Sequence, residues 1–359
     1  MTQISEIFEQ ALDQERSGNP AEAIKLYRSI LDIRPDHPEA NFNIATIADQ
    51  YGQTDAAIQC FKTAVGASPK QAEYWKALLN ALVRSGRREE ALAQLKLARN
   101  SGFDAQTLTL PEELLDWEKQ MKDTDRFQQD HAAAARALPG TLYNQWLAWF
   151  QRTLQPATYL EIGVESGKTL ELAKPPTRCI GIDPQPQISV QLKASAQIYA
   201  QTSDVFFQNI SADQLFDGDR IDLAFIDGFH SFDQALKDFI NVEAYAHEKS
   251  VVLFHDVYPL NPLSASRERQ SRFWLGDTWK VVPLLKEARP DLNIKTIPSY
   301  PSGLAMVTGL NPDDQSLRNR SAEWIEKWLP VAYEDYANKL PETLNLIGNN
   351  ENEILKNLP

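Results

Sequence analysis

Residues 159–167, with the sequence Tyr-Leu-Glu-Ile-Gly-Val-Glu-Ser-Gly, constrain the fold of this chain more than any other segment. The first four are mostly apolar, as in a strand buried on both faces, and this character ends at Gly163. Gly163 and Gly167 bracket a short turn, and residues 168–173 can start a helix. A strand that leads through a glycine turn into a helix forms the nucleotide pocket of an open α/β sheet. We therefore expect a doubly wound, mostly parallel, Rossmann-like sheet around this segment.

The spacing of the glycines indicates which cofactor the turn can hold. The dinucleotide fingerprint G-x-G-x-x-G is absent because Glu165 stands two residues after Gly163, where its carboxylate would repel a pyrophosphate. An acid before the first glycine, Glu161, suits a cofactor with an ammonium group and no phosphate, such as S-adenosylmethionine. A second predicted strand, residues 179–183, ends in Asp183, which can accept hydrogen bonds from both ribose hydroxyls of a nucleoside.

Composition limits the classes of partner and the compartment. The chain has 359 residues and a net charge of −13 without a long Lys/Arg run, which argues against nucleic acid as its main partner. The longest apolar runs are far shorter than a membrane span, and the acidic, amphipathic N-terminus is not typical of a signal peptide. Cys60 and Cys179 lie in apolar periodic stretches, as reduced core residues of a cytoplasmic protein do.

The first hundred residues repeat with a period of 34. Glycine permits a turn between two helices, alanine allows close helix packing, a large apolar residue fills the next layer, and proline ends the second helix. The repeated positions are Gly18, Gly52 and Gly86; Ala23, Ala57 and Ala91; Tyr27, Phe61 and Leu95; Ile30, Ala64 and Ala98; and Pro35 and Pro69. This pattern resembles the tetratricopeptide repeat, whose unit is a helix pair of this length. It implies three units over residues 1–102 that act as a scaffold or self-association surface, which we favour, or as a peptide-binding groove.

The remaining chain is predicted to contain a helical linker, an α/β domain and C-terminal helices, over residues 103–140, 141–315 and 316–359. Strands are expected at residues 159–162, 179–183, 205–209, 221–227 and 250–256, with a closing pair at 292–297 and 304–308. Helices are expected at residues 168–173, 188–200, 232–246, 277–288, 321–329 and 331–340. An acid then lies at or near the carboxyl end of each of the first five strands, where ligands bind in such sheets: Glu161, Asp183, Asp213, Asp227 and Asp256.

Two short clusters follow the fourth and fifth predicted strands. If these strands are neighbours, about 5 Å apart, Asp227 and Asp256 converge on a site that can hold a hard divalent cation. His230 would lie over the same site and could take a proton from a hydroxyl group. Alone, each residue suits an ordinary helix-capping or packing role. The grouping of these acids with His230 and His255 favours a functional site.

These motifs resemble class I S-adenosylmethionine-dependent methyltransferases, and in particular the metal-dependent branch that includes macrolide sugar O-methyltransferases. The motifs are Glu161-Ile-Gly-Val-Glu-Ser-Gly167, Ile182-Asp183, Ile226-Asp-Gly-Phe-His-Ser-Phe232, Phe254-His-Asp256 and Asp277-Thr-Trp-Lys280. The resemblance covers residues 141–310. It implies that the cofactor is bound by Glu161, Gly163, Gly167, Asp183, Ser211 and Asp213, with the last two at the adenine.

The same resemblance implies that Asp227 and Asp256 bind Mg²⁺ or Mn²⁺ and that His230 is the general base. Some sugar enzymes have an acid at the position of His255, which makes His255 a candidate second base or metal ligand. The predicted activity is methyl transfer to a hydroxyl of a sugar, glycan or other small molecule, with the long loop at residues 257–276 as an acceptor lid. The alternatives are a repeat scaffold with an inactive methyltransferase fold and a nicotinamide oxidoreductase, which lacks support without the middle glycine.

Overall fold

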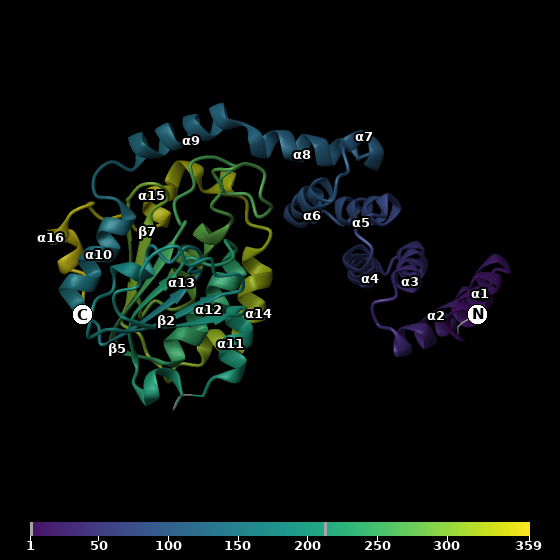
Figure 1. The fold of residues 1–359 in the computed structure, drawn as a ribbon. Coiled ribbons are helices and arrows are strands. Elements are labelled where there is room, and N and C mark those ends of the chain that lie inside the picture. Colours follow the sequence, from purple (N-terminus) through teal and green to yellow (C-terminus); the bar gives the residue numbers. More distant parts are fainter. Residues whose placement is uncertain (1–2, 212–213) are drawn as a thin grey trace. The chain divides into compact units, whose positions relative to one another are not determined.

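The computed structural model describes residues 3–211 and 214–359 and contains two compact units, Met1–Lys122 and Asp123–Pro359 (Figure 1). The described part of the first unit is helical, whereas the second is built around a sheet. Both cysteines are free.

The first unit consists of three antiparallel helix pairs followed by two further helices. The helices are α1 (Gln3–Arg16), α2 (Pro20–Ile33), α3 (Pro38–Gln50), α4 (Thr54–Ala67), α5 (Ala72–Arg84), α6 (Arg88–Asn100), α7 (Ala105–Leu108) and α8 (Glu112–Lys122). Each pair turns at a glycine with positive φ, at Gly18, Gly52 and Gly86. The repeated alanines and large apolar residues are buried, which confirms the predicted helical solenoid. This unit continues past residue 102, because Leu114 of α8 joins its core and Glu118 pairs with Arg99.

The second unit contains a seven-stranded sheet in the order β3-β2-β1-β4-β5-β7-β6. The strands are β1 (Thr158–Ile162), β2 (Arg178–Asp183), β3 (Ser195–Ala200), β4 (Ile221–Ile226), β5 (Ala246–His255), β6 (Asn293–Ile297) and β7 (Leu304–Thr308). The first five are parallel, and β7 runs antiparallel to both β5 and β6. Ile162 pairs with Ile226, which pairs with Phe254, so β1, β4 and β5 end side by side. The predicted mostly parallel, Rossmann-like sheet is confirmed.

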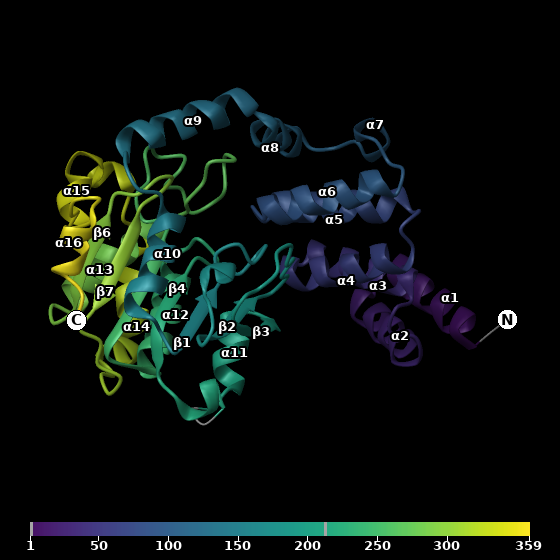
Figure 2. The same ribbon diagram turned by 60° about the vertical axis from the view of Figure 1, so that its left-hand side comes forward.

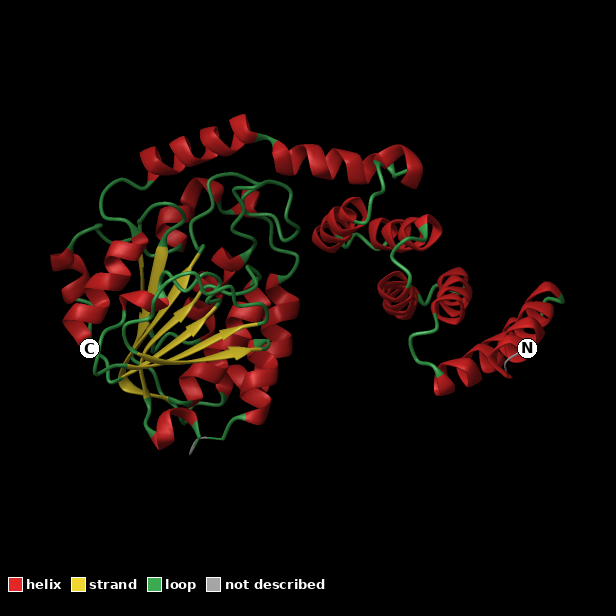
Figure 3. Cartoon of the chain, viewed as in Figure 1, coloured by secondary structure: helices red, strands yellow, loops and turns green. Residues whose placement is uncertain are grey.

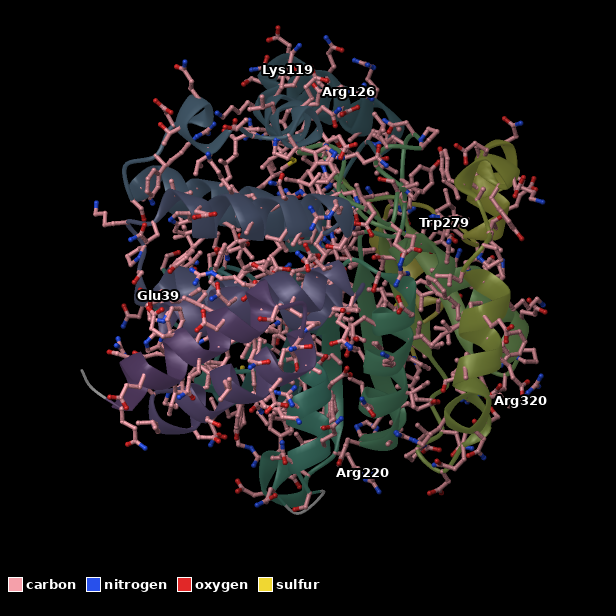
Figure 4. The ribbon with its side chains drawn as sticks, turned by 90° about the vertical axis from the view of Figure 1, so that its right-hand side faces the viewer. Glu39, Lys119, Arg126, Arg220, Trp279 and Arg320 are labelled. Carbon is pink, nitrogen blue, oxygen red and sulfur yellow. The ribbon has the colours of Figure 1, made fainter. Side chains whose placement is uncertain are left out.

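Helices cover both faces of the sheet (Figure 3). One face packs against α12 (Phe232–Ala244), α13 (Val281–Ala288) and α14 (Ser316–Trp328), and the other against α10 (Tyr143–Leu154) and α16 (Glu351–Leu355). Trp279 is fully buried within the first layer, whereas Arg320 of α14 points to solvent (Figure 4). The two layers leave the carboxyl ends of the central strands as the place where a ligand can reach the sheet.

The predicted helix at residues 188–200 and strand at residues 205–209 are wrong. Residues 195–200 form strand β3 at the edge of the sheet, and Ser203–Asn209 form helix α11 (Figure 2). The sequence of this edge strand has no apolar run, because its side chains are exposed or only partly buried. The apolar run of α11 buries Phe206, and Thr202 Oγ1 caps the helix by accepting from Val205 N at 3.3 Å.

Two further predicted helices are shorter or broken. Residues 168–173 contain only a 3₁₀ turn, Leu170–Leu172. Residues 331–340 form two 3₁₀ turns, Tyr333–Asp335 and Ala337–Lys339, before the short helix α15 (Leu340–Thr343). Neither difference changes the order of the strands.

Helix α9 (Thr124–Ala137) packs against the loop at residues 257–276. Ala134 is buried with Phe273 and Leu275 of that loop. His131 Nδ1 lies 2.6 Å from the hydroxyl of Tyr300, and the Arg272 guanidinium lies 4.3 Å from the centre of the Phe127 ring. The half of the predicted linker that α9 forms is therefore part of the second unit.

We expect a chain starting at Asp123 to be more stable than one starting at Thr141. The shorter chain lacks α9 and exposes Phe273 and Leu275, which should lower the free energy of unfolding by about 2–4 kcal/mol. Urea unfolding of the two chains measures this difference. Equal midpoints and slopes would show that α9 contributes nothing to the fold of the second unit.

Candidate functional site

A cavity of about 740 Å³ opens at the carboxyl ends of β1, β2, β4 and β5. Six of the predicted site residues line it: Gly163, Asp183, Asp227, His230, His255 and Asp256. Glu161, Gly167 and Ser211 are not among the described residues of its wall, and Asp213 lies outside the described residues. The volume is in the range of pockets that bind small molecules and cofactors.

The glycine turn after β1 fits tightly against the end of β4. Gly163 has a φ of +90°, and a Cβ atom there would lie 1.9 Å from the backbone oxygen of Asp227. Gly163 N donates to Ile182 O at 2.8 Å, and Asp227 N donates to Ile162 O at 2.9 Å. Only glycine can occupy this position, and the turn fixes the backbone of Asp227 at the edge of the cavity.

Asp183 is held by two backbone groups at the end of β2. Its Oδ2 accepts from Glu165 N at 2.8 Å, and its Oδ1 accepts from Gln185 N at 2.7 Å. Each carboxylate oxygen keeps a further lone pair. The side chain is therefore preorganised to accept the two hydroxyls of a ribose from the cavity.

Glu161 lies behind the turn rather than in the cavity wall. It is fully buried, and its carboxyl oxygens accept from the Tyr159 hydroxyl at 2.6 Å and the Thr169 hydroxyl at 2.7 Å. Burial raises the pKa of Glu161 to about 8. The side chain thus ties the strand to the residues that follow the turn.

Two carboxylates and two imidazoles meet at the ends of β4 and β5. His255 Nδ1 lies 3.2 Å from Asp227 Oδ1 and 3.4 Å from Asp256 Oδ1. His230 Nε2 lies 3.1 Å from Asp256 Oδ2 and 3.8 Å from Asp227 Oδ1. Ligand atoms from Asp227, His230 and Asp256 all lie within 4.8 Å of one another, a spacing that could hold a metal ion.

The charges of this cluster stabilise one another. Burial alone would lower the pKa of His255, but the carboxylates of Asp256 and Asp227 outweigh it and raise the pKa to about 9. Burial alone would raise the pKa of Asp227, but His255 and His230 hold it below its ordinary value. Asp227 is therefore stabilised in its ionised form by the imidazoles beside it.

His230 is fixed by the loop at residues 257–276. Its ring stacks on Trp274, with centres 5.2 Å apart and planes 18° apart. A Cβ atom at Gly276 would lie 1.7 Å from His230 O, so the loop approaches this backbone as closely as glycine allows. His230 and Asp256 both have left-handed backbone angles, with φ of +52° and +57°. Strain of this kind in non-glycine residues is concentrated at functional sites.

The far wall of the cavity contains residues that the sequence did not indicate. Gln234 Nε2 of α12 donates to Ser203 Oγ at 3.2 Å, Asp204 Oδ1 at 3.1 Å and Asp238 Oδ1 at 3.0 Å. All four side chains line the cavity, and burial raises the pKa of Asp238 to about 6. The assignment of β3 to residues 195–200 would have identified this wall, because the residues after a strand of the sheet face the ligand.

Each of the two units contains a segment that matches a known family model. Residues 14–82 match the family model described as tetratricopeptide repeat, and residues 160–257 match the one described as methyltransferase domain. No curated protein matches the chain. None of the helices in residues 3–211 and 214–359 has the length and apolar character needed to cross a bilayer.

Several solved structures are similar to separate parts of the chain. A proposed O-methyltransferase from Klebsiella pneumoniae has 14% identity and a TM-score of 0.36, over 54% of this chain and 99% of that one. A mutant of MamA has 23% identity and a TM-score of 0.26, over 29% and 76%. The Yersinia enterocolitica type III secretion chaperone SycD, in complex with a peptide of the translocator YopD, has 19% identity and a TM-score of 0.26, over 28% and 77%. The chain therefore contains a helical segment that matches the tetratricopeptide repeat model and a Rossmann-like unit that matches the methyltransferase domain model.

Proposed function

We propose that the methyltransferase domain transfers the methyl group of S-adenosylmethionine to a hydroxyl of a sugar, glycan or other small molecule, with the help of a divalent cation. The observation that carries this proposal is the arrangement of one cavity. Its wall contains both Asp183, whose carboxylate suits a ribose, and the cluster around Asp227 and Asp256.

The cavity has features that suit this cofactor. Asp183 is oriented for the ribose by Glu165 N and Gln185 N. The network around Gln234 supplies polar groups for the adenine, and Gly163 lines the cavity where the methionine portion would lie. The wall carries several carboxylates, which favour the positively charged sulfonium. For the adenine we therefore favour Ser203, Asp204 and Gln234 over Ser211.

The donor set at the strand ends fits a divalent cation. Carboxylate oxygens from Asp227 and Asp256 are the ligands that Mg²⁺ and Mn²⁺ prefer, and the charges of two carboxylates balance one divalent ion. Such a cation lowers the pKa of a bound hydroxyl. His230 would accept the hydroxyl proton on Nε2 while Trp274 holds its ring in place.

We propose that the repeats serve as a scaffold or a partner-binding module. The match to the tetratricopeptide family and the separate core of the first unit support a role in protein interaction. Self-association of the chain through this unit is included in the proposal.

Incubation with S-adenosylmethionine that carries a ¹³C-labelled methyl group tests the proposed reaction. The protein and a cell extract of small molecules should yield a labelled product that is heavier than an extract component by one ¹³CH₂ unit. Asp256→Asn protein should yield none, because it lacks half of the carboxylate pair. If the wild-type protein binds the cofactor but labels nothing in extracts from varied sources, the alternative of a scaffold with an inactive methyltransferase fold is favoured.

A further inference from the structure

His255 occupies a position between the two carboxylates that a metal ligand would take. Its Nδ1 is 3.2 Å from Asp227 Oδ1 and 3.4 Å from Asp256 Oδ1. Two atoms bound to one ion at about 2.1 Å and at right angles lie about 3 Å apart. Nδ1 therefore lies at the spacing of a neighbouring ligand from each of the two carboxylates.

The other nitrogen of His255 is held as in metal-binding histidines. Nε2 lies 3.1 Å from the hydroxyl of Ser302, which is buried. In the neutral imidazole, a hydrogen bond from Nε2–H to this hydroxyl would leave the lone pair of Nδ1 free for a cation. Metal-bound histidines are usually fixed through their second nitrogen in this way. Tyr143 packs against the ring, with centres 4.1 Å apart, and limits its rotation.

His230 is placed differently. Its Nε2 approaches Oδ2 of Asp256, whereas His255 faces Oδ1 of both acids. Its side chain is 27% exposed in the cavity, against 8% for that of His255. The structure thus separates a buried imidazole within the cluster from a more exposed one that an acceptor can reach.

We propose that His255 Nδ1 binds the cation together with Asp227 and Asp256, and that this nitrogen makes the site select Mn²⁺ over Mg²⁺. The inference rests on the proposed function, because it concerns the same cation. Imidazole favours first-row transition ions, whereas Mg²⁺ prefers a shell of oxygen atoms. The protein should bind Mn²⁺ at least about tenfold more tightly than Mg²⁺.

Pulsed electron paramagnetic resonance of Mn²⁺ bound to the full chain tests the proposal. A coordinated imidazole gives a ¹⁴N modulation, which should change to a ¹⁵N pattern when the histidines carry ¹⁵N. This comparison needs no substitution and is independent of any folding defect. In His255→Gln protein the nitrogen signal should disappear and the preference for Mn²⁺ over Mg²⁺ should fall about tenfold or more. The nitrogen signal should persist in His230→Gln protein.

His247→Gln protein serves as the matched control. His247 lies on the same strand and contacts a carboxylate, Asp222, at 2.8 Å, but it is outside the cavity wall. Mn²⁺ bound without any nitrogen signal would overturn the assignment of His255 and leave the proposed methyl transfer intact. Loss of the signal in His230→Gln protein, with retention in His255→Gln protein, would assign the ligand to His230 instead. Failure of Mn²⁺ to bind would overturn both this assignment and the cation in the proposed function, and calorimetry with S-adenosylhomocysteine on the same sample would test the cofactor pocket separately.

Discussion

Asp227→Asn protein is expected to lose methyl transfer while it still binds the cofactor. Asp227 supplies one of two carboxylates at the strand ends, and a single carboxylate is too little for a cation that prefers several oxygen ligands. The backbone of Asp227 supports the glycine turn through Ile162 O, and an asparagine keeps that bond. The cofactor dissociation constant should therefore change by less than about tenfold, because the substitution removes no hydrogen bond to the ribose.

EDTA should have the same effect on the wild-type protein, and added Mn²⁺ should restore transfer. Rates measured with and without chelator, beside calorimetry of cofactor binding, separate the two functions of the cavity. Asp313→Asn protein, changed at an exposed position, controls for the loss of a surface charge. Transfer at the full rate in EDTA would contradict the cation model and leave the two histidines to act alone.

His230→Gln protein is expected to transfer methyl groups about 10²- to 10⁴-fold more slowly, the usual contribution of a positioned base. The cation should still bind, because both carboxylates remain. The loss should be smaller at high pH, where hydroxide can take the proton in place of the imidazole. The rate constant at saturating substrate, measured across pH, gives this comparison.

Trp274→Phe protein is the companion variant, because a smaller ring can still stack on His230. It should lose far less activity than His230→Gln protein. An equal loss of rate in both variants that does not become smaller at high pH would contradict this role. It would mean that the stacked pair binds the acceptor and that another group takes the proton.

The central part of the site could be predicted because its constraints are local. A glycine at Gly163 follows from a left-handed turn that leaves no space for a Cβ atom. The meeting of Asp227 with Asp256 follows from parallel neighbouring strands, whose carboxyl ends share one edge. The first prediction needs only a short motif, and the second needs only one rule of sheet topology.

The cavity wall that we propose for the adenine could not be predicted in the same way. The run Val-Phe-Phe at residues 205–207 is apolar over too short a length to distinguish a strand from a buried helix turn. Strand β3 lies at the sheet edge and is not buried on both faces, so its sequence has no apolar run. A strand at residues 205–209 would place Ser211 and Asp213 at the carboxyl edge of the sheet, which is why they are the predicted adenine residues. The same error leaves Asp204 and Gln234 of the cavity wall unpredicted.

The roles of single side chains depend on distances that a sequence does not contain. The motif predicts that Glu161 binds the cofactor, and only the structure shows that its carboxyl group is buried and bonded to Tyr159 and Thr169. His255 was expected to be a base or a ligand. Its burial against Ser302 and Tyr143 gives an acceptor less access to it than to His230, which is why we propose it as a ligand.

Calorimetric titration with S-adenosylhomocysteine tests the central claim, that this cavity is a methyltransferase cofactor site. We expect one molecule to bind per chain and no heat from NAD. Asp183→Ala protein should bind more weakly by about 1–3 kcal/mol, because the ribose hydroxyls lose their acceptor. Tight binding of NAD without a response to S-adenosylhomocysteine, or unchanged affinity in Asp183→Ala protein, would contradict the account.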